Sequence, residues 1–189
     1  MQSIWSDTTK IPKQKELKGD IHVQNVVIGA GMAGILTAYL LQKKGLEVIV
    51  IEADKVAGGQ TKNTTAKVTS QHGLCYHNMI KKAGKSRAKG YAMANEAAIT
   101  AYEEIIKEEG IECHFERLPS FLYSTKEEGR EILTQETEAA KALGINASFL
   151  SGNKIQELPF AATGAVCFEN QAQFHPLAFI KALAEKLTI

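Results

Sequence analysis

The sequence predicts an α/β fold that begins with a β–α–β unit, and three observations support this prediction. A short apolar run, residues 23–28, leads directly into the motif G-x-G-x-x-G at residues 29–34. A helical pattern follows and stops at Gly45, and a second apolar run, residues 48–51, ends on Glu52. Both runs are almost purely apolar, as expected for parallel strands that are buried on both faces. This order is typical of a Rossmann-like dinucleotide-binding unit.

Each residue of the motif has a physical reason. Gly29 permits a tight turn, Gly31 lets the backbone approach a pyrophosphate, and Gly34 lets the helix pack close to the sheet. The helix N-terminus offers N–H groups and a positive dipole end to phosphates. Glu52 is placed to accept hydrogen bonds from ribose hydroxyls, which disfavours the 2′-phosphate of NADP. FAD and NAD remain open, and the alternative is a plain β–α–β unit with a Gly-rich turn.

The composition is that of an ordinary globular protein of one domain or slightly more. The chain has 189 residues, 44% of them hydrophobic, and a net charge of +1, which favours neither nucleic acid nor an anionic membrane surface. No apolar run approaches the roughly 20 residues of a membrane span, and the polar N-terminus lacks a signal core. Cys75, Cys113 and Cys167 form no C-x-x-C pair, so we predict no metal site and a cytoplasmic location.

The polar segment 57–67 follows Glu52 directly. It is either a surface connection or a second loop that contacts the cofactor through threonine hydroxyls and backbone N–H groups. We favour the second reading because ligands bind at the carboxyl ends of parallel strands in such sheets.

The other elements alternate between helices and short strands. We expect an extended arm (1–20), followed by a strand at 23–28, a helix at 32–44 and a strand at 48–51. Helices at 75–83 and 87–109, strands at 111–117 and 120–125, and a helix at 126–143 come next. The last elements are strands at 147–150 and 164–168, with a turn at 158–159 between them, and a helix from Pro176 to the end of the chain. The predicted domains are the arm 1–20, a cofactor-binding part 21–85, a partial α+β substrate cap 86–175 and a returning helix 176–189.

Four segments carry a resemblance to a known family: 3–20, 29–34, the run TTAKVTSQHG at 64–73, and NQAQFHP at 170–176. Together they resemble the FAD-dependent oxidoreductases of the D-amino-acid oxidase (glycine and sarcosine oxidase) superfamily, above all bacterial members with a C-terminal Rieske domain. The resemblance covers essentially the whole chain. Members of this family continue well past position 189, so the chain resembles a truncated N-terminal part.

The resemblance implies FAD rather than NAD. It implies an enzyme that oxidises an amine, an amino acid or a similar CH–XH substrate by hydride transfer to flavin, with a Rieske iron–sulfur domain in the full-length parent and self-association of the truncated chain. Carried over by position, the cofactor-binding residues are Gly29, Ala30, Gly31, Met32, Ala33, Gly34, Glu52, Ala53, Gly59, Gln60, Thr61, Thr64, Thr65 and Lys67.

No acid–base pair is required by the sequence, because flavin itself performs the difficult step. The catalytic candidates are His72, because histidine is the residue type suited to acid–base chemistry near neutral pH, and Lys67, which could place a positive charge beside the flavin. Their alternatives are a histidine that caps a turn and a solvated loop lysine. We expect His175 to fix the turn into the last helix. The alternative functions are a non-catalytic dinucleotide-binding fragment and an NAD-dependent enzyme.

Overall fold

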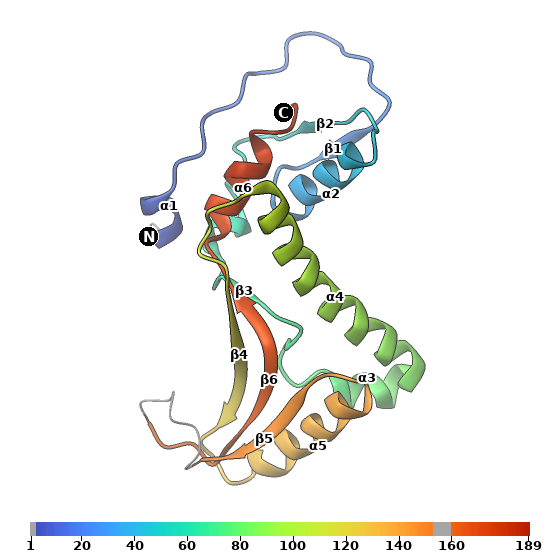
Figure 1. Ribbon diagram of the computed structural model, residues 1–189, viewed down its shortest axis with the longest axis vertical. Coiled ribbons are helices and arrows are strands. Elements are labelled where there is room, and N and C mark those ends of the chain that lie inside the picture. Colours follow the sequence, from blue (N-terminus) through green and yellow to red (C-terminus); the bar gives the residue numbers. More distant parts are fainter. Residues whose placement is uncertain (1–2, 153–159) are drawn as a thin grey trace. The chain divides into compact units, whose positions relative to one another are not determined.

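The computed structural model describes residues 3–152 and 160–189, and Figure 1 shows its ribbon. The chain divides into two compact units. The first unit comprises Met1–Ala66, Glu109–His114 and Phe174–Ile189, and the second comprises Lys67–Glu108 and Phe115–Gln173. The ranges 21–85 and 86–175 that we predicted divide the chain differently. The predicted turn at 158–159 lies outside the described residues.

The first unit contains the predicted β–α–β order, which the structure confirms. Strands β1 and β2 pair in parallel, with Val26 opposite Ile49 and Ile28 opposite Ile51. Helix α2 packs against both strands and against α6. The elements of this unit are α1 (Ile4–Thr8), β1 (Val26–Ile28), α2 (Met32–Lys43), β2 (Ile49–Ile51), the 3-10 helix η1 (Gln60–Asn63) and α6 (Pro176–Ala184).

Two expectations for this unit are wrong. The arm is not extended throughout, because Ser3 caps a short helix, α1, through a hydrogen bond from the Ser6 amide. The two strands are not buried on both faces: Val50 is 1% exposed, but Ile28 is 83% exposed. Within the described part of the chain the sheet has two strands, and α2 covers one face of them. Apolar side chains on the other face therefore meet solvent.

The second unit is built on an antiparallel sheet in which β6 is central (Figure 1). Strand β4 pairs along one edge of β6, and β5 and β3 pair with successive parts of the other edge. Helix α5 packs against β5, β6 and α3 over a core that includes Tyr76, Leu143 and Phe168. The elements are β3 (Lys67–Val68), α3 (Tyr76–Ala83), α4 (Lys85–Glu109, whose last residue falls in the first unit), β4 (Glu116–Ser124), α5 (Gly129–Ala142), β5 (Ala147–Ser151) and β6 (Gly164–Gln173).

The structure corrects the predicted strands 111–117 and 120–125. A single strand, β4, runs through Pro119, and its register against β6 shifts between Leu118 and Ser120. Proline has no N–H to donate to the ladder, and a bulge is one of the few places where a strand accepts it. Strand β6 also extends to Gln173, beyond the predicted end at 168.

Helix α3 begins on a buried carboxylate from another helix. Glu136 of α5 is 2% exposed, and its two oxygens accept hydrogen bonds from the amides of Tyr76 and His77 at 2.7 and 2.9 Å. Its negative charge lies at the positive end of α3 and satisfies two N–H groups that have no partner inside the helix. This contact joins α3 to α5. No helix in residues 3–152 or 160–189 combines the length and apolar character needed to cross a bilayer.

Candidate cofactor-binding site

Two glycines of the motif are required by the fold itself. Gly29 ends β1 with φ +97°, in the left-handed region that glycine adopts most readily, and its amide donates to the Ile51 carbonyl at 2.7 Å. A Cβ on Gly34 would lie 1.8 Å from the Gly29 carbonyl oxygen. The first turn of α2 thus approaches the end of β1 too closely for any side chain at position 34.

Gly31 is different, because the fold does not require it. Its φ is −81°, which other residues adopt, and a Cβ there would meet only the Thr61 hydroxyl, at an ordinary 3.6 Å. A glycine without a steric or conformational reason inside the protein leaves room at the entrance to α2. This space fits a group that must approach the backbone closely, such as a pyrophosphate.

The N-terminus of α2 has donors to offer. Gly31 occupies the capping position and supplies no side-chain acceptor. Thr61 of η1 is 7% exposed, and its hydroxyl accepts the Met32 amide at 3.1 Å. Among the described residues, the amides of Ala33 and Gly34 have no hydrogen-bond acceptor in a loop or side chain. These two N–H groups and the positive end of the helix favour an anion.

Glu52 lies at the carboxyl end of β2 and contacts the glycine loop. One carboxylate oxygen accepts the Ala30 amide at 2.8 Å, and the other accepts the Asp54 amide at 3.0 Å. These backbone N–H groups, that of Ala30 first, hold the pKa of Glu52 below its ordinary value, so the side chain is ionised at neutral pH. Each oxygen keeps lone-pair capacity for a ribose hydroxyl.

The structure brings several of the predicted residues together. Hydrogen bonds connect Ala30 to Glu52 and Met32 to Thr61. The amide of Ala57, a residue with φ +55°, donates to the Ala30 carbonyl at 2.9 Å. Thr64 is farther along the loop, where its hydroxyl accepts the Ala66 amide. Four other residues that we predicted to bind the cofactor follow β2 and are exposed: Ala53, Gly59, Gln60 and Thr65.

Lys67 and His72 belong to the second unit. Lys67 is exposed and pairs with Gln173 in the short β3 ladder. His72 is exposed, its Nε2 lies 3.2 Å from the Asn95 side-chain oxygen, and its ring meets that of Tyr91 edge-on at 6.4 Å. Neither side chain is connected by a hydrogen bond in the described residues to the loop of Gly29–Gly34.

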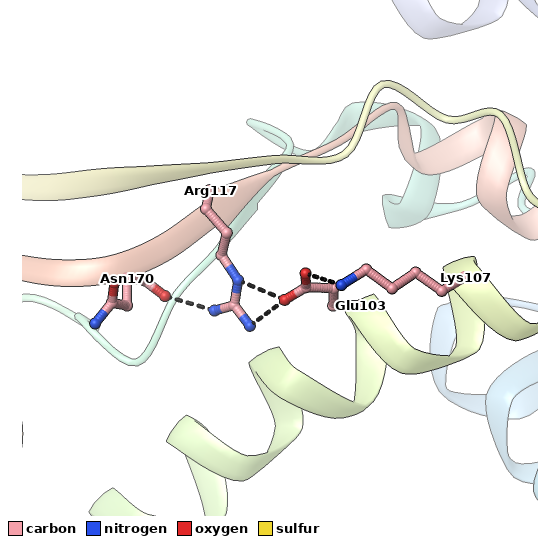
Figure 2. A network of polar contacts seen from close by, with 4 residues as sticks. All are labelled: Glu103, Lys107, Arg117 and Asn170. Carbon is pink, nitrogen blue, oxygen red and sulfur yellow. Dashed lines mark hydrogen bonds and ion pairs between the residues drawn. The ribbon is translucent and has the colours of Figure 1, made fainter.

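A polar cluster in the second unit was not predicted. Figure 2 shows Arg117 of β4 between Glu103 of α4 and the backbone of Asn170. The guanidinium donates twice to Glu103 Oε2, at 2.9 and 2.7 Å, and once to the Asn170 carbonyl. Lys107 contacts the other Glu103 oxygen, and Lys107 and then Arg117 lower the pKa of Glu103. Asn170 has φ +59°.

A cavity of about 570 Å³ adjoins this cluster and is lined by Met93, Glu96, Ala97, Thr100, Arg117 and Asn170. Behind it, Gln171 is 1% exposed, and its amide donates to Glu96 while its oxygen accepts from Thr69 and Ser70. The segment 170–176 carries part of the family resemblance, but no local pattern in the sequence shows that Arg117 faces α4. No cluster of three or more metal-ligating side chains occurs within residues 3–152 and 160–189.

Comparison with known proteins supplies the family. Residues 25–188 match the model described as "DAO: FAD dependent oxidoreductase". YhfW of Bacillus subtilis (strain 168), named as a Rieske 2Fe-2S iron–sulfur protein, is 37% identical over 186 residues, which make up 98% of this chain and 36% of YhfW.

Two solved structures share the fold. Glycine oxidase from Bacillus cereus superposes with a TM-score of 0.65 at 18% identity, over 87% of this chain and 43% of the oxidase. L-Amino acid deaminase from Proteus myxofaciens gives a TM-score of 0.69 at 16% identity, over 98% of this chain and 39% of the deaminase. The chain therefore spans less than half of each of these relatives.

The family match extends over the glycine loop, Glu52, the segment 57–67 and α6. It decides between the two cofactors that the β–α–β unit left open, because the family is FAD-dependent. The predicted family and the predicted cofactor are both confirmed, and the chain belongs to the DAO family of FAD-dependent oxidoreductases.

Proposed function

We propose that this chain holds the ADP half of FAD in an enzyme that oxidises an amine, an amino acid or a similar CH–XH substrate. The observation that carries the proposal is the contrast among the three glycines. Gly29 and Gly34 are required by the fold. Gly31 is the capping residue of α2 and has no side chain, so it leaves open space beside the N-terminus of this helix.

The roles of the residues follow from their donors and acceptors. The Ala33 and Gly34 amides donate to the pyrophosphate, and Gly31 lets it approach. Ionised Glu52 accepts from the ribose hydroxyls, and its bonds to Ala30 and Asp54 hold the carboxylate in place. Thr61 orients the first amide of α2 through its hydroxyl. The exposed residues Ala53, Gly59, Gln60 and Thr65 provide further contacts along the cofactor.

Bound FAD supplies the hydride acceptor, and the protein binds, orients and tunes it. Lys67 contributes a positive charge near the flavin. His72 contributes its imidazole ring, which the hydrogen bond to Asn95 holds in position. Residues 86–175 form part of the substrate cap. The names of two relatives with this fold, glycine oxidase and L-amino acid deaminase, support an amino acid or amine as substrate.

A partner and a location complete the proposal. YhfW is named as a Rieske 2Fe-2S protein, and this supports an iron–sulfur domain as a partner of the flavin in the full-length protein. The spacing of Cys75, Cys113 and Cys167, which form no C-x-x-C pair in the sequence, supports a reducing compartment such as the cytoplasm.

The proposal is tested by titrating the purified full-length protein with FAD and with NAD, while following flavin fluorescence and absorption for the first and calorimetry for the second. We expect saturable binding of FAD, no binding of NAD, and competition between FAD and ADP. FAD binding that ADP does not displace would place the ADP half elsewhere.

The reaction is tested by mixing the FAD-loaded protein with amines and amino acids in the absence of oxygen. A substrate bleaches the visible flavin absorption, because hydride transfer reduces the flavin. Binding of FAD without bleaching by any member of a broad panel would favour the alternative, a non-catalytic dinucleotide-binding protein.

A further inference from the structure

The N-terminal helix α1 makes a set of specific contacts within the first unit. The Trp5 indole N–H donates to the Thr64 carbonyl at 3.0 Å, across 59 positions of sequence. The Trp5 ring meets the His175 ring edge-on, with centroids 5.0 Å apart and planes at 67°. Helix α1 packs against both η1 and α6. A five-residue helix is not stable alone, so these contacts hold it in place.

His175 fixes the other side of this arrangement. Its Nδ1 accepts the Ala178 amide at 3.2 Å, which caps α6. The proton of the neutral ring therefore lies on Nε2. That atom lies 2.8 Å from the Thr8 hydroxyl and 3.3 Å from the Thr9 hydroxyl. Thr8 in turn donates to the Ile4 carbonyl at 2.7 Å, so its hydroxyl oxygen can accept the proton of Nε2.

The carbonyl that Trp5 contacts belongs to the loop that contains the predicted cofactor residues. Thr61 binds the first amide of α2, and Thr64 binds the Ala66 amide through its side chain. The Ala66 carbonyl accepts the amide of Phe174 at 3.2 Å. The loop is thus fixed at Thr61 and at Ala66, and between these points the hydrogen bond from Trp5 restrains the backbone.

We propose that Trp5 is a positioning residue for FAD: its indole N–H holds the loop of residues 60–66 in the conformation that contacts the cofactor. The inference rests on the proposed function, since the loop matters only where FAD binds beside it. Trp5 acts through its hydrogen bond to the Thr64 carbonyl.

The test is Trp5→Phe in the full-length protein, because phenylalanine keeps an aromatic ring against His175 and removes the N–H. We expect faster hydrogen–deuterium exchange of the amides in residues 60–66 of the apoprotein. We also expect FAD affinity to fall about three- to tenfold, the effect of losing one neutral hydrogen bond. The matched control is Leu17→Ala, a truncation at a 59% exposed position of the same arm, which should change neither quantity.

The outcomes separate this inference from the proposed function. Unchanged exchange of residues 60–66 in Trp5→Phe would show that the arm does not restrain the loop. Faster exchange with unchanged FAD affinity would show that the restrained loop does not position FAD, and would also overturn the inference. If the unaltered protein fails to bind FAD at all, the proposed function falls, and the positioning role falls with it.

Discussion

Gly29, Gly31 and Gly34 share one motif but differ in the space around them. A Cβ at position 34 would collide with the Gly29 carbonyl, whereas a Cβ at position 31 is accommodated by the protein. We therefore expect Gly31→Ala to weaken FAD binding about tenfold or more, since the methyl group occupies the place of a phosphate contact. Its stability cost should stay near 1 kcal/mol or less, as for alanine at a capping position.

Gly34→Ala is the counterpart of this variant. It should lower the free energy of unfolding by about 1–3 kcal/mol or more, as overpacking does. Urea denaturation and FAD titration of both variants provide the check. Equal FAD affinity in Gly31→Ala and in the unaltered protein would show that the loop does not receive the phosphates.

Glu52 provides the second prediction at this scale. Glu52→Ala should weaken FAD binding by about 1.5–3 kcal/mol, the range for hydrogen bonds to a charged group, and Glu52→Gln should lose less because one acceptor survives. Isothermal titration with FAD measures both variants, and the melting temperature of the apoprotein serves as the control for folding. Small, equal losses in the two variants would place Glu52 away from the ribose.

At the scale of elements, the cap of α6 depends on the protonation state of one side chain. His175 accepts the Ala178 amide only while Nδ1 is unprotonated. Burial, aided by the neighbouring His114, lowers the pKa of His175 below its ordinary value of 6.5. The folded state therefore favours the neutral ring, and the stability that it contributes is complete above the unfolded pKa and is lost as the pH falls through the folded pKa.

We expect the free energy of unfolding to decrease between about pH 7 and pH 5, where histidine titrates. In His175→Asn, whose side-chain oxygen can cap without titrating, this part of the pH dependence should disappear. Urea denaturation across this pH range compares the two proteins. An identical pH dependence in His175→Asn would show that the group responsible lies elsewhere.

Helix α4 is charged against its own dipole. Its first turn contains no acidic residue, and Lys85 and Arg87 are exposed there. Cations near a helix N-terminus are unfavourable, so Lys85→Glu should raise the free energy of unfolding by about 0.3–1 kcal/mol at low ionic strength.

The control for α4 makes the same lysine-to-glutamate change at the C-terminus of a helix, where the dipole is negative. Lys81 is in the last turn of α3, where a cation is favourable, and Lys81→Glu should lower stability by a similar amount. Thermal unfolding at low and high salt measures both. Shifts of the same sign in the two variants would mean that overall charge, not the dipole, determines the effect.

At the scale of the whole molecule, the exposed face of β1 and β2 predicts self-association of this chain. Ile28, Val26 and Ile51 are 83%, 49% and 36% exposed, next to each other on two short strands. Adjacent apolar side chains on an exposed face favour contact between copies. We expect a concentration-dependent mass in light scattering.

Ile28→Thr should shift this equilibrium towards the monomer. The control is Ile132→Thr, which removes a 50% exposed isoleucine from α5, an element of the second unit. It should leave the mass unchanged. A monomer at all concentrations would contradict the prediction.

The β–α–β unit could be predicted from the sequence because its signals are local. The motif 29–34, the helical spacing after it and Glu52 at the end of β2 lie within 30 residues, and the fold class followed from them. The family and FAD followed from the resemblance of segments 3–20, 29–34, 64–73 and 170–176. In the structure, Ala30 is hydrogen-bonded to Glu52, and Met32 to Thr61. The long helices were predicted for the same local reason.

The contacts that join distant residues could not be predicted from the sequence, because they depend on how the elements pack. Pro119 suggested a break, yet pairing with β6 keeps β4 continuous through a bulge. Glu136 caps a helix that begins 60 residues earlier, and Trp5 binds a carbonyl 59 residues later. No local sequence pattern predicts either contact, because hydrophobic periodicity shows which face of an element is apolar but not which other element will cover it. The covering element is determined by packing, since each apolar face must be buried and each buried polar group needs a hydrogen-bond partner.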